Sequence, residues 1–337
     1  MVDNVTMAAL SIGKLRGLQQ ISGRDGILTI CAMDHRGSFR RMINPARPEA
    51  VSHEQMVERK LELCRAFAPL STAILLDPIY GAAQCISQGA LPGTTGLLVS
   101  IEATGYVGNR ESRLTELLEG WGVEKIKRMG ASAVKILVYF RPDLEELARR
   151  QLDTVRTVAE QCLEHDIPFL VEPVSYPVGS EVDNPEEFAR RKPELVIETA
   201  RQITALPIDI LKAEFPADLR YQQDRSVLLR LCRQLDEASA VPWVILSAGV
   251  DFDAFYRQVE IASQAGASGF LGGRAIWQEA MSMSSPAERT RFLATVGAER
   301  MQRLSQVARQ HGTPWFHKLG HAPAEPAHTP ENWYRDY

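Results

Sequence analysis

The chain has 337 residues, of which 45% are hydrophobic and 24% charged, and its formal net charge is −4. This composition excludes the basic surface that nucleic-acid binding needs, and no apolar run reaches the roughly 20 residues of a membrane span. The amino terminus lacks a charged and then apolar secretion signal. We therefore expect a cytoplasmic protein that binds a small molecule, and neither nucleic acid nor a membrane.

Short apolar runs alternate along the chain with amphipathic segments, after a polar, helical lead over residues 1–26. Buried strands are expected at residues 27–33, 73–76, 97–101, 133–139, 169–171, 208–216, 243–246 and 269–271. Apolar residues at helical spacing predict helices around residues 57–67, 114–121, 152–162, 227–235 and 255–262. Asn184 and Pro185 form a helix start, and Lys192-Pro193 is interpreted as the opening of the main helix that follows.

Eight strand-then-helix units without a break in composition predict a (β/α)8 barrel. We assign residues 1–311 to this single domain and residues 312–337 to an irregular, proline-rich tail. Four tail aromatics are candidates for docking on a surface. They are Trp315, Phe316, Trp333 and Tyr334.

The cysteines give no sign of a disulfide framework or a zinc site, because they are dispersed and odd in number. We expect them to be small buried residues. The five are Cys31, Cys64, Cys85, Cys162 and Cys232.

The sixth expected strand carries a lysine, Lys212, within an Ile/Leu-rich run. Burial favours the neutral form of an amine, which can attack a carbonyl and form a Schiff base. The alternative is a structural lysine paired with Glu214, two residues on and on the same face of the strand.

The ends of the other strands are also polar, and in this architecture strand ends and the loops after them meet at one mouth of the barrel. So many charged groups at one end favour an active site over a structural role. The strand-end groups are Asp34-His35-Arg36, Asp77, Glu102, Lys135, Glu172, Lys212 with Glu214, Ser247-Ala248-Gly249 and Gly272-Gly273-Arg274. The glycines and Arg274 in the last two turns suit a phosphate group.

Several of these strand ends carry motifs that resemble the tagatose 1,6-bisphosphate aldolases, class I Schiff-base aldolases with a (β/α)8 barrel. The motifs are AMDHRG (32–37), LLDPIYG (75–81), EATGY (102–106), AVKIL (133–137), DIPFLVE (166–172), DILKAE (209–214), LSAGV (246–250) and GRA (273–275). The resemblance implies an enzyme that cleaves a ketohexose 1,6-bisphosphate to glycerone phosphate and glyceraldehyde 3-phosphate. It also implies that no cofactor or metal is used, and that the chain forms a dimer or larger homo-oligomer.

The same resemblance implies roles for individual residues. Lys212 forms the imine and Glu172 is the general acid/base. Lys135 is a second cation that repels the charge of Lys212 and binds substrate oxygens, and Asp34 contacts substrate hydroxyls. The phosphate next to the ketone is assigned to Ser247, Gly249, Gly273 and Arg274.

The far end of the substrate is less defined, because His35 stands where many relatives have glutamine. The segment Arg36–Arg41 reads either as a loop that binds the second phosphate or as a solvated basic loop, and a sulfonate is an alternative to that phosphate. Two further alternatives are a metal-dependent aldolase, although only His35 among the histidines lies at a strand end, and a regulatory protein that binds sugar phosphates.

Overall fold

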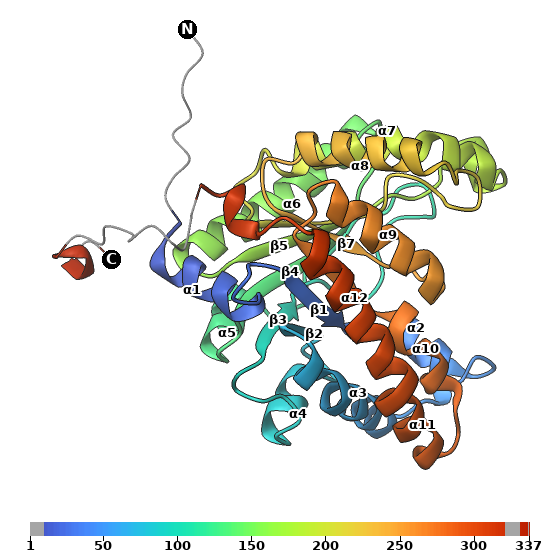
Figure 1. Ribbon diagram of the computed structural model, residues 1–337. Coiled ribbons are helices and arrows are strands. Elements are labelled where there is room, and N and C mark those ends of the chain that lie inside the picture. Colours follow the sequence, from blue (N-terminus) through green and yellow to red (C-terminus); the bar gives the residue numbers. More distant parts are fainter. Residues whose placement is uncertain (1–9, 321–330, 336) are drawn as a thin grey trace, which may run out of the picture.

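The computed structural model describes residues 10–320, 331–335 and 337. Eight parallel strands close into a barrel in sequence order, which confirms the predicted (β/α)8 fold (Figure 1). The strands are β1 (Leu28–Ala32), β2 (Ala73–Leu76), β3 (Gly96–Ser100), β4 (Ala133–Tyr139), β5 (Phe169–Val174), β6 (Ile210–Ala213), β7 (Trp243–Leu246) and β8 (Gly269–Gly272).

Helices surround the barrel, with α7 and α8 on one side and α3 and α11 on the opposite side (Figure 1). The helices are α1 (Ile12–Ile21), α2 (Gly37–Ile43), α3 (His53–Phe67), α4 (Ala82–Ser87), α5 (Val123–Arg128), α6 (Glu145–Glu164), α7 (Pro185–Ile203), α8 (Arg225–Ala238), α9 (Phe252–Gln264), α10 (Arg274–Ser282), α11 (Pro286–Phe292) and α12 (Ala298–His311).

Closure of the barrel depends on the pairing of β1 with β8, in which Leu28 lies opposite Gly269. Gly269 has a φ of 134°, and a Cβ atom there would lie 1.9 Å from the carbonyl oxygen of Leu28. Only glycine fits at this position without displacing the neighbouring strand.

Side chains alternate between two cores, as strand geometry requires. The outward-facing side chains pack against the helices. The inward-facing side chains fill the barrel, and Leu18 and Ile21 of α1 together with Trp315 of the tail extend this inner core. These three residues cover the amino-terminal end of the strands, and the cavity of the barrel lies at the carboxyl end.

The predicted lead and tail are partly confirmed. Residues 12–21 are helical, whereas residues 1–9 and 321–330 lie outside the described part of the chain. Trp315 is buried and donates a hydrogen bond to Ser22, as docking requires, and Phe316 packs beside it. Trp333 and Tyr334 are 38% and 59% exposed in the single chain, so their docking on a surface stays a prediction. The division of the chain at residue 311 stays a prediction.

The helix predicted around residues 114–121 is absent. This segment instead returns as extended chain along the end of β3, with antiparallel bridges joining Glu102 to Leu117 and Val107 to Leu114. The backbone N–H of Leu118 donates to the carbonyl of Ile101, just after β3. The chain at the end of β3 thus binds a backbone N–H group that would have bonded within the segment if it were a helix. The helix that follows, α5, begins only after Gly122.

Two further expectations about local structure are wrong. The helix capped by Asn184, with Pro185 at its first position, continues without a break to Ile203. Pro193 lacks one N–H group for the helix, and burial of the apolar face of α7 offsets that loss. The predicted loop 36–41 is largely helical, because α2 begins at Gly37.

Candidate active site

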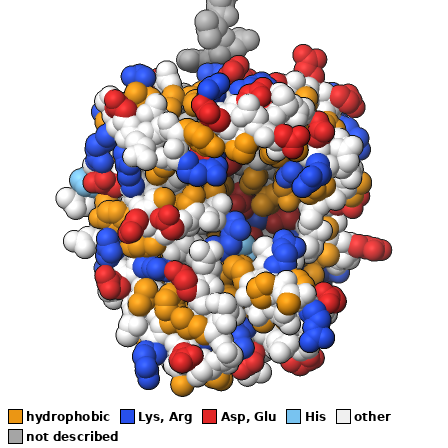
Figure 2. Space-filling model, turned by 90° about the vertical axis from the view of Figure 1, so that its right-hand side faces the viewer, with side chains coloured by type: hydrophobic (Ala, Val, Ile, Leu, Met, Phe, Trp, Pro, Cys, Tyr) orange, Lys and Arg blue, Asp and Glu red, His pale blue; other side chains and the backbone are white. Residues whose placement is uncertain are grey.

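A cavity of about 520 Å³ lies at the carboxyl end of the barrel. On the face shown in Figure 2 the surface is hollowed at its centre, and acidic and basic side chains gather inside the hollow. The cavity is lined by nine of the ten predicted site residues, namely Asp34, His35, Arg36, Lys135, Glu172, Lys212, Ser247, Gly273 and Arg274. The tenth, Gly249, lies behind Arg274 and does not line the wall.

The alternation of side chains along the strands explains why these groups meet. Ile210 and Leu170 point into the barrel core, so Lys212 and Glu172, two residues further along the same strands, point inward at the mouth. Ala133 and Lys135 are related in the same way on β4. The charged groups therefore form the layer of side chains directly above the apolar core.

Glu172 joins the two lysines of the cavity. Its Oε1 lies 2.7 Å from Nζ of Lys212, and its Oε2 lies 3.0 Å from Nζ of Lys135. Lys135 makes two further ion pairs of 2.7 Å, with Asp34 and Glu102. All five side chains are at most 10% exposed, so water screens these interactions weakly.

Burial and charge act in opposite directions on the acids of this cluster. Burial alone would raise the pKa of Glu172 and of Asp34, but attraction to Lys135 and Lys212 outweighs it and lowers the pKa of both carboxyl groups. Burial would lower the pKa of Lys135, whereas Asp34, Glu102 and Glu172 raise it well above its ordinary value. Lys135 is thus a fixed cation, and both acids are ionised at neutral pH. The predicted repulsion between Lys135 and Lys212 stays a prediction.

His35 lies beside this cluster as a neutral imidazole. Burial lowers the pKa of His35 to about 3, despite the nearby Asp34 carboxylate, which acts in the opposite direction. The imidazole packs edge-on against Trp277, with ring centroids 5.4 Å apart, and against Gly273, where a Cβ atom would lie 3.0 Å from its Cε1.

The predicted phosphate-binding turns also come together. Gly249 has a φ of 78°, and a Cβ atom at this position would lie 2.9 Å from Cζ of Arg274. The guanidinium of Arg274 therefore packs against the bare backbone of Gly249, and its Nε has no hydrogen-bond partner among the described residues. Gly273 precedes the first residue of α10, where backbone N–H groups are free to bind an anion.

The two terminal nitrogens of the Arg36 guanidinium have different surroundings. Its Nη2 donates to the carbonyl oxygens of Glu102 and Ala103, at 2.8 and 3.2 Å. Its buried Nη1 has no hydrogen-bond partner in the described part of the chain. Arg41 lines the same side of the cavity, so two cations flank this part of the wall.

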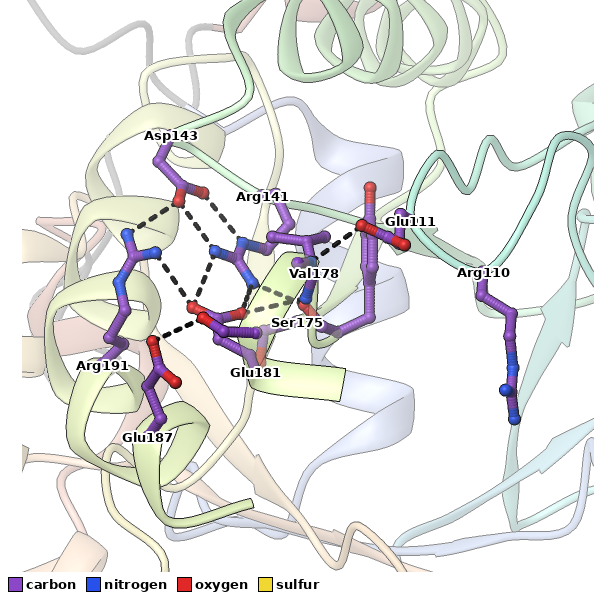
Figure 3. Close-up of polar contacts among 12 residues, drawn as sticks. Arg110, Glu111, Arg141, Asp143, Ser175, Val178, Glu181, Glu187 and Arg191 are labelled. Atoms are coloured by element: carbon purple, nitrogen blue, oxygen red, sulfur yellow. Dashed lines mark hydrogen bonds and ion pairs between the residues drawn. The ribbon is translucent and has the colours of Figure 1, made fainter. Parts of the chain in front are cut away.

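An ion network holds the loop that follows β5, and thereby the strand end that carries Glu172. Arg141, which is fully buried, pairs with Asp143 at 2.7 Å and with Glu181 at 2.5 Å (Figure 3). Arg191 of α7 contacts the same two carboxylates, at 2.8 and 2.9 Å. Glu111 accepts a hydrogen bond of 2.8 Å from the backbone of Gly179, so the segment after β3 is tied to the same loop.

Two acidic residues differ from what the sequence predicted. Glu214 does not pair with Lys212; it binds Lys192 of α7 at 3.2 Å and accepts hydrogen bonds from Ser175, so the predicted pairing of Lys212 with Glu214 is wrong. Glu102 was recognised as a strand end but not as a site residue. Its Oε1 binds Lys135, and its buried Oε2 has no partner within the described residues. The sequence signal that could have identified this pair is a charged residue just beyond β3, Glu102, next to a charged residue on the neighbouring strand β4, Lys135.

In the part of the chain that the structure describes, no three or more His, Cys, Asp and Glu side chains are arranged to hold a metal ion. Among the described helices, none combines the length and the apolar character needed to cross a bilayer.

Comparison with known proteins places most of the chain in one family. The model of the DeoC/LacD family aldolases matches residues 28–279. Tagatose 1,6-diphosphate aldolase 2 of Streptococcus agalactiae is 31% identical over 324 residues, which cover 91% of this chain and 98% of that protein. Tagatose 1,6-diphosphate aldolase 1 of Enterococcus faecalis is 31% identical over 331 residues, covering 93% and 100%.

Solved structures share the barrel at lower identity. A Schiff-base-forming fructose-1,6-bisphosphate aldolase has a TM-score of 0.59 and 20% identity, covering 87% of this chain and 98% of that chain. The fructose-bisphosphate aldolase of Plasmodium falciparum has a TM-score of 0.66 and 13% identity, covering 88% and 93%. At these identities the likeness concerns the fold alone.

Proposed function

This chain belongs to the DeoC/LacD family of aldolases, and from that premise we propose that it is a class I aldolase that forms a Schiff base through Lys212. Its substrate is a ketohexose 1,6-bisphosphate, such as tagatose 1,6-bisphosphate or an epimer, and its products are glycerone phosphate and glyceraldehyde 3-phosphate. The observation that carries the proposal is the contact of 2.7 Å between Nζ of Lys212 and Oε1 of Glu172 inside the cavity.

This contact supports a simple route for the first proton. Glu172 takes a proton from the Lys212 ammonium, and the neutral amine then attacks the ketone carbon to form a carbinolamine. Loss of the ammonium charge removes one of the two cations that hold Glu172 ionised, so the protonated acid is stabilised at this stage. Glu172 then returns the proton to the departing hydroxyl, which leaves as water and yields the iminium.

Cleavage of the bond between C3 and C4 follows from the positive charge of the iminium. The electron pair of the breaking bond moves into the iminium and forms a neutral enamine, while the hydroxyl on C4 gives its proton to the Glu172 carboxylate and becomes the aldehyde. Asp34 is proposed to bind that hydroxyl, since its carboxylate is ionised and held at 2.7 Å by Lys135. Glu172 returns this proton to the enamine carbon, and water then hydrolyses the iminium to release glycerone phosphate and the Lys212 amine.

Each end of the cavity is proposed to bind one of the two anionic groups of the substrate. Ser247, Gly273 and Arg274, with Gly249 behind the guanidinium, are proposed to bind the phosphate next to the ketone. Arg36, whose Nη1 is buried and unpartnered among the described residues, is proposed to bind the far anionic group together with Arg41. A sulfonate satisfies the same two cations, so a sulfonated fructose 1-phosphate is the second substrate to test.

The proposal is tested by measuring release of glycerone phosphate from ketohexose 1,6-bisphosphates and from the sulfonated analogue, with and without a chelator. The wild type should cleave a bisphosphate with and without chelator, and Lys212→Met should have no measurable turnover. Lys14→Met is the matched control, because Lys14 forms a buried ion pair of 2.8 Å with Asp209 outside the cavity. Inhibition by the chelator would favour a metal-dependent enzyme. A wild type that binds the bisphosphate without cleaving it would favour a regulatory role.

We further propose that the enzyme works in the cytoplasm as a homo-oligomer. All five cysteines are free and buried, which suits a reducing compartment. Light scattering on the purified protein measures the mass of the assembly, and a monomer at micromolar concentration would contradict the oligomer.

A further inference from the structure

Lys60 lies outside the cavity, on α3, at a position where the helix otherwise presents apolar side chains to the core. The buried stripe of this helix consists of Met56, Lys60, Leu63, Cys64 and Phe67. Lys60 and its partner Asp77 are both 0% exposed. A fully buried ammonium is costly unless its donors are satisfied, so its contacts indicate why it is there.

All three N–H groups of Lys60 have an acceptor. Nζ donates to the carbonyl oxygen of Met33 at 2.6 Å, to that of His35 at 2.8 Å, and to Oδ2 of Asp77 at 2.5 Å. The other oxygen of Asp77 accepts the backbone N–H groups of Ile79 and Tyr80, at 2.9 and 2.8 Å. Lys60 therefore connects the end of β1 to a rigid turn after β2.

The two carbonyl groups that Lys60 binds belong to Met33 and His35, the residues before and after Asp34. Strand β1 ends at Ala32, so this stretch of backbone no longer has the support of continuous pairing on both sides. The bond to Met33 fixes the peptide unit directly before Asp34, and the bond to His35 fixes the peptide unit between His35 and Arg36, one residue beyond Asp34. The carboxylate of Asp34 is thereby directed to its contact of 2.7 Å with Lys135 inside the cavity.

We propose that Lys60 is a positioning residue for the cleavage step, which it serves by holding the backbone on both sides of Asp34. The inference rests on the proposed aldolase function. Lys60 touches neither Lys212 nor Glu172, so imine formation should depend on it weakly and carbon–carbon cleavage strongly. A displacement of about 1 Å of a group that orients the substrate can lower a rate by about 100-fold.

The alternative is that Lys60 only stabilises the fold by satisfying buried acceptors. The two roles differ in which step responds. Loss of a purely structural contact lowers all activities in proportion to the folded fraction. Loss of a positioning contact separates cleavage from imine formation.

The test compares Lys60→Met with Lys14→Met in the full-length protein. Lys14 is the matched control, because its ammonium is also buried and also pairs with a carboxylate, Asp209, at 2.8 Å. For each variant we would measure kcat and KM for cleavage of the bisphosphate, the fraction of Lys212 trapped by borohydride in the presence of glycerone phosphate, and the melting temperature. The double variant Lys60→Met/Asp77→Asn removes the unpaired buried charge and serves if the single variant does not fold.

We expect both single variants to lose thermal stability. Lys60→Met should lower kcat by about 100-fold while trapping at Lys212 stays within about twofold of the wild type. Lys14→Met should change neither quantity by more than about twofold, because it is distant from the site.

The inference is overturned if Lys60→Met retains the wild-type kcat, or if cleavage and trapping fall together in proportion to the folded fraction. Failure of the wild type to cleave any ketose bisphosphate would overturn the proposed function itself and the inference with it. A cleaving wild type beside an unaffected Lys60→Met would overturn the inference alone.

Discussion

Replacing His35 with glutamine is expected to change how the stability of the protein depends on pH. In the folded protein burial lowers the pKa of His35 from 6.5 to about 3. In the unfolded chain the imidazole recovers its ordinary pKa and binds a proton below pH 6.5. The unfolded state therefore binds more protons than the folded state between these two values, and stability falls as the pH is lowered through this window.

The size of the effect follows from the two pKa values. Well below pH 6.5 the loss approaches about 1.4 kcal/mol per pH unit. Between pH 7.5 and pH 5.0 it amounts to about 2 kcal/mol in the free energy of unfolding. Asp34 and Glu172 act in a separate window, because the pKa of each is lowered by the lysines. Their stabilisation is present above the unfolded-state pKa of about 4 and is lost only below it.

The assay is urea unfolding of the wild type and of His35→Gln at pH 7.5 and pH 5.0, followed by far-ultraviolet circular dichroism. Tryptophan fluorescence is less suitable, since His35 contacts Trp277. We expect the wild type to lose about 2 kcal/mol more than the variant between the two pH values. Equal losses in the two proteins would show that His35 titrates normally in the folded state and would refute the reasoning.

Three further predictions concern other parts of the site. Glu172→Gln should lower the rate constant of single-turnover cleavage by about 100- to 10,000-fold, because no group then exchanges a proton with Lys212. An unchanged rate constant would exclude Glu172 as the acid/base. Gly249→Ala should raise KM by about tenfold, because the added methyl group displaces the guanidinium of Arg274. This change corresponds to a loss of about 1.4 kcal/mol of binding free energy. An unchanged KM in steady-state assays would place the phosphate elsewhere. Arg141→Met should lower the free energy of unfolding by about 3–5 kcal/mol, because the buried carboxylate of Glu181 then loses one of its two arginine partners. The measurement is urea unfolding, and a loss below about 1 kcal/mol would show that the network is dispensable.

The barrel and much of the site could be predicted because both depend on strand periodicity. Apolar runs locate the strands, and inward-facing polar residues within or directly after these runs meet at the same mouth in a parallel barrel. This rule alone predicts that Lys212, Glu172 and Lys135 lie together. The same periodicity says which face a side chain occupies, but not which partner it contacts.

The errors come from places where a contact outside the local segment decides the structure. Glu214 lies two residues after Lys212, yet β6 ends at Ala213 and Lys192 of α7 binds its carboxylate. The apolar residues of segment 114–121 have helical spacing, but the end of β3 supplies their backbone partners. Neither the helix partner of Glu214 nor the returning chain is visible in a local pattern.

The central claim is that the amine of Lys212 attacks the ketone. The most direct measurement is mass spectrometry of the peptides after incubation with glycerone phosphate and reduction with borohydride. We predict that the peptide containing Lys212 gains the mass of one reduced glycerone phosphate, and that the peptide containing Lys135 gains none. Attachment at Lys135 instead, or no attachment in a protein that cleaves its substrate, would contradict the account.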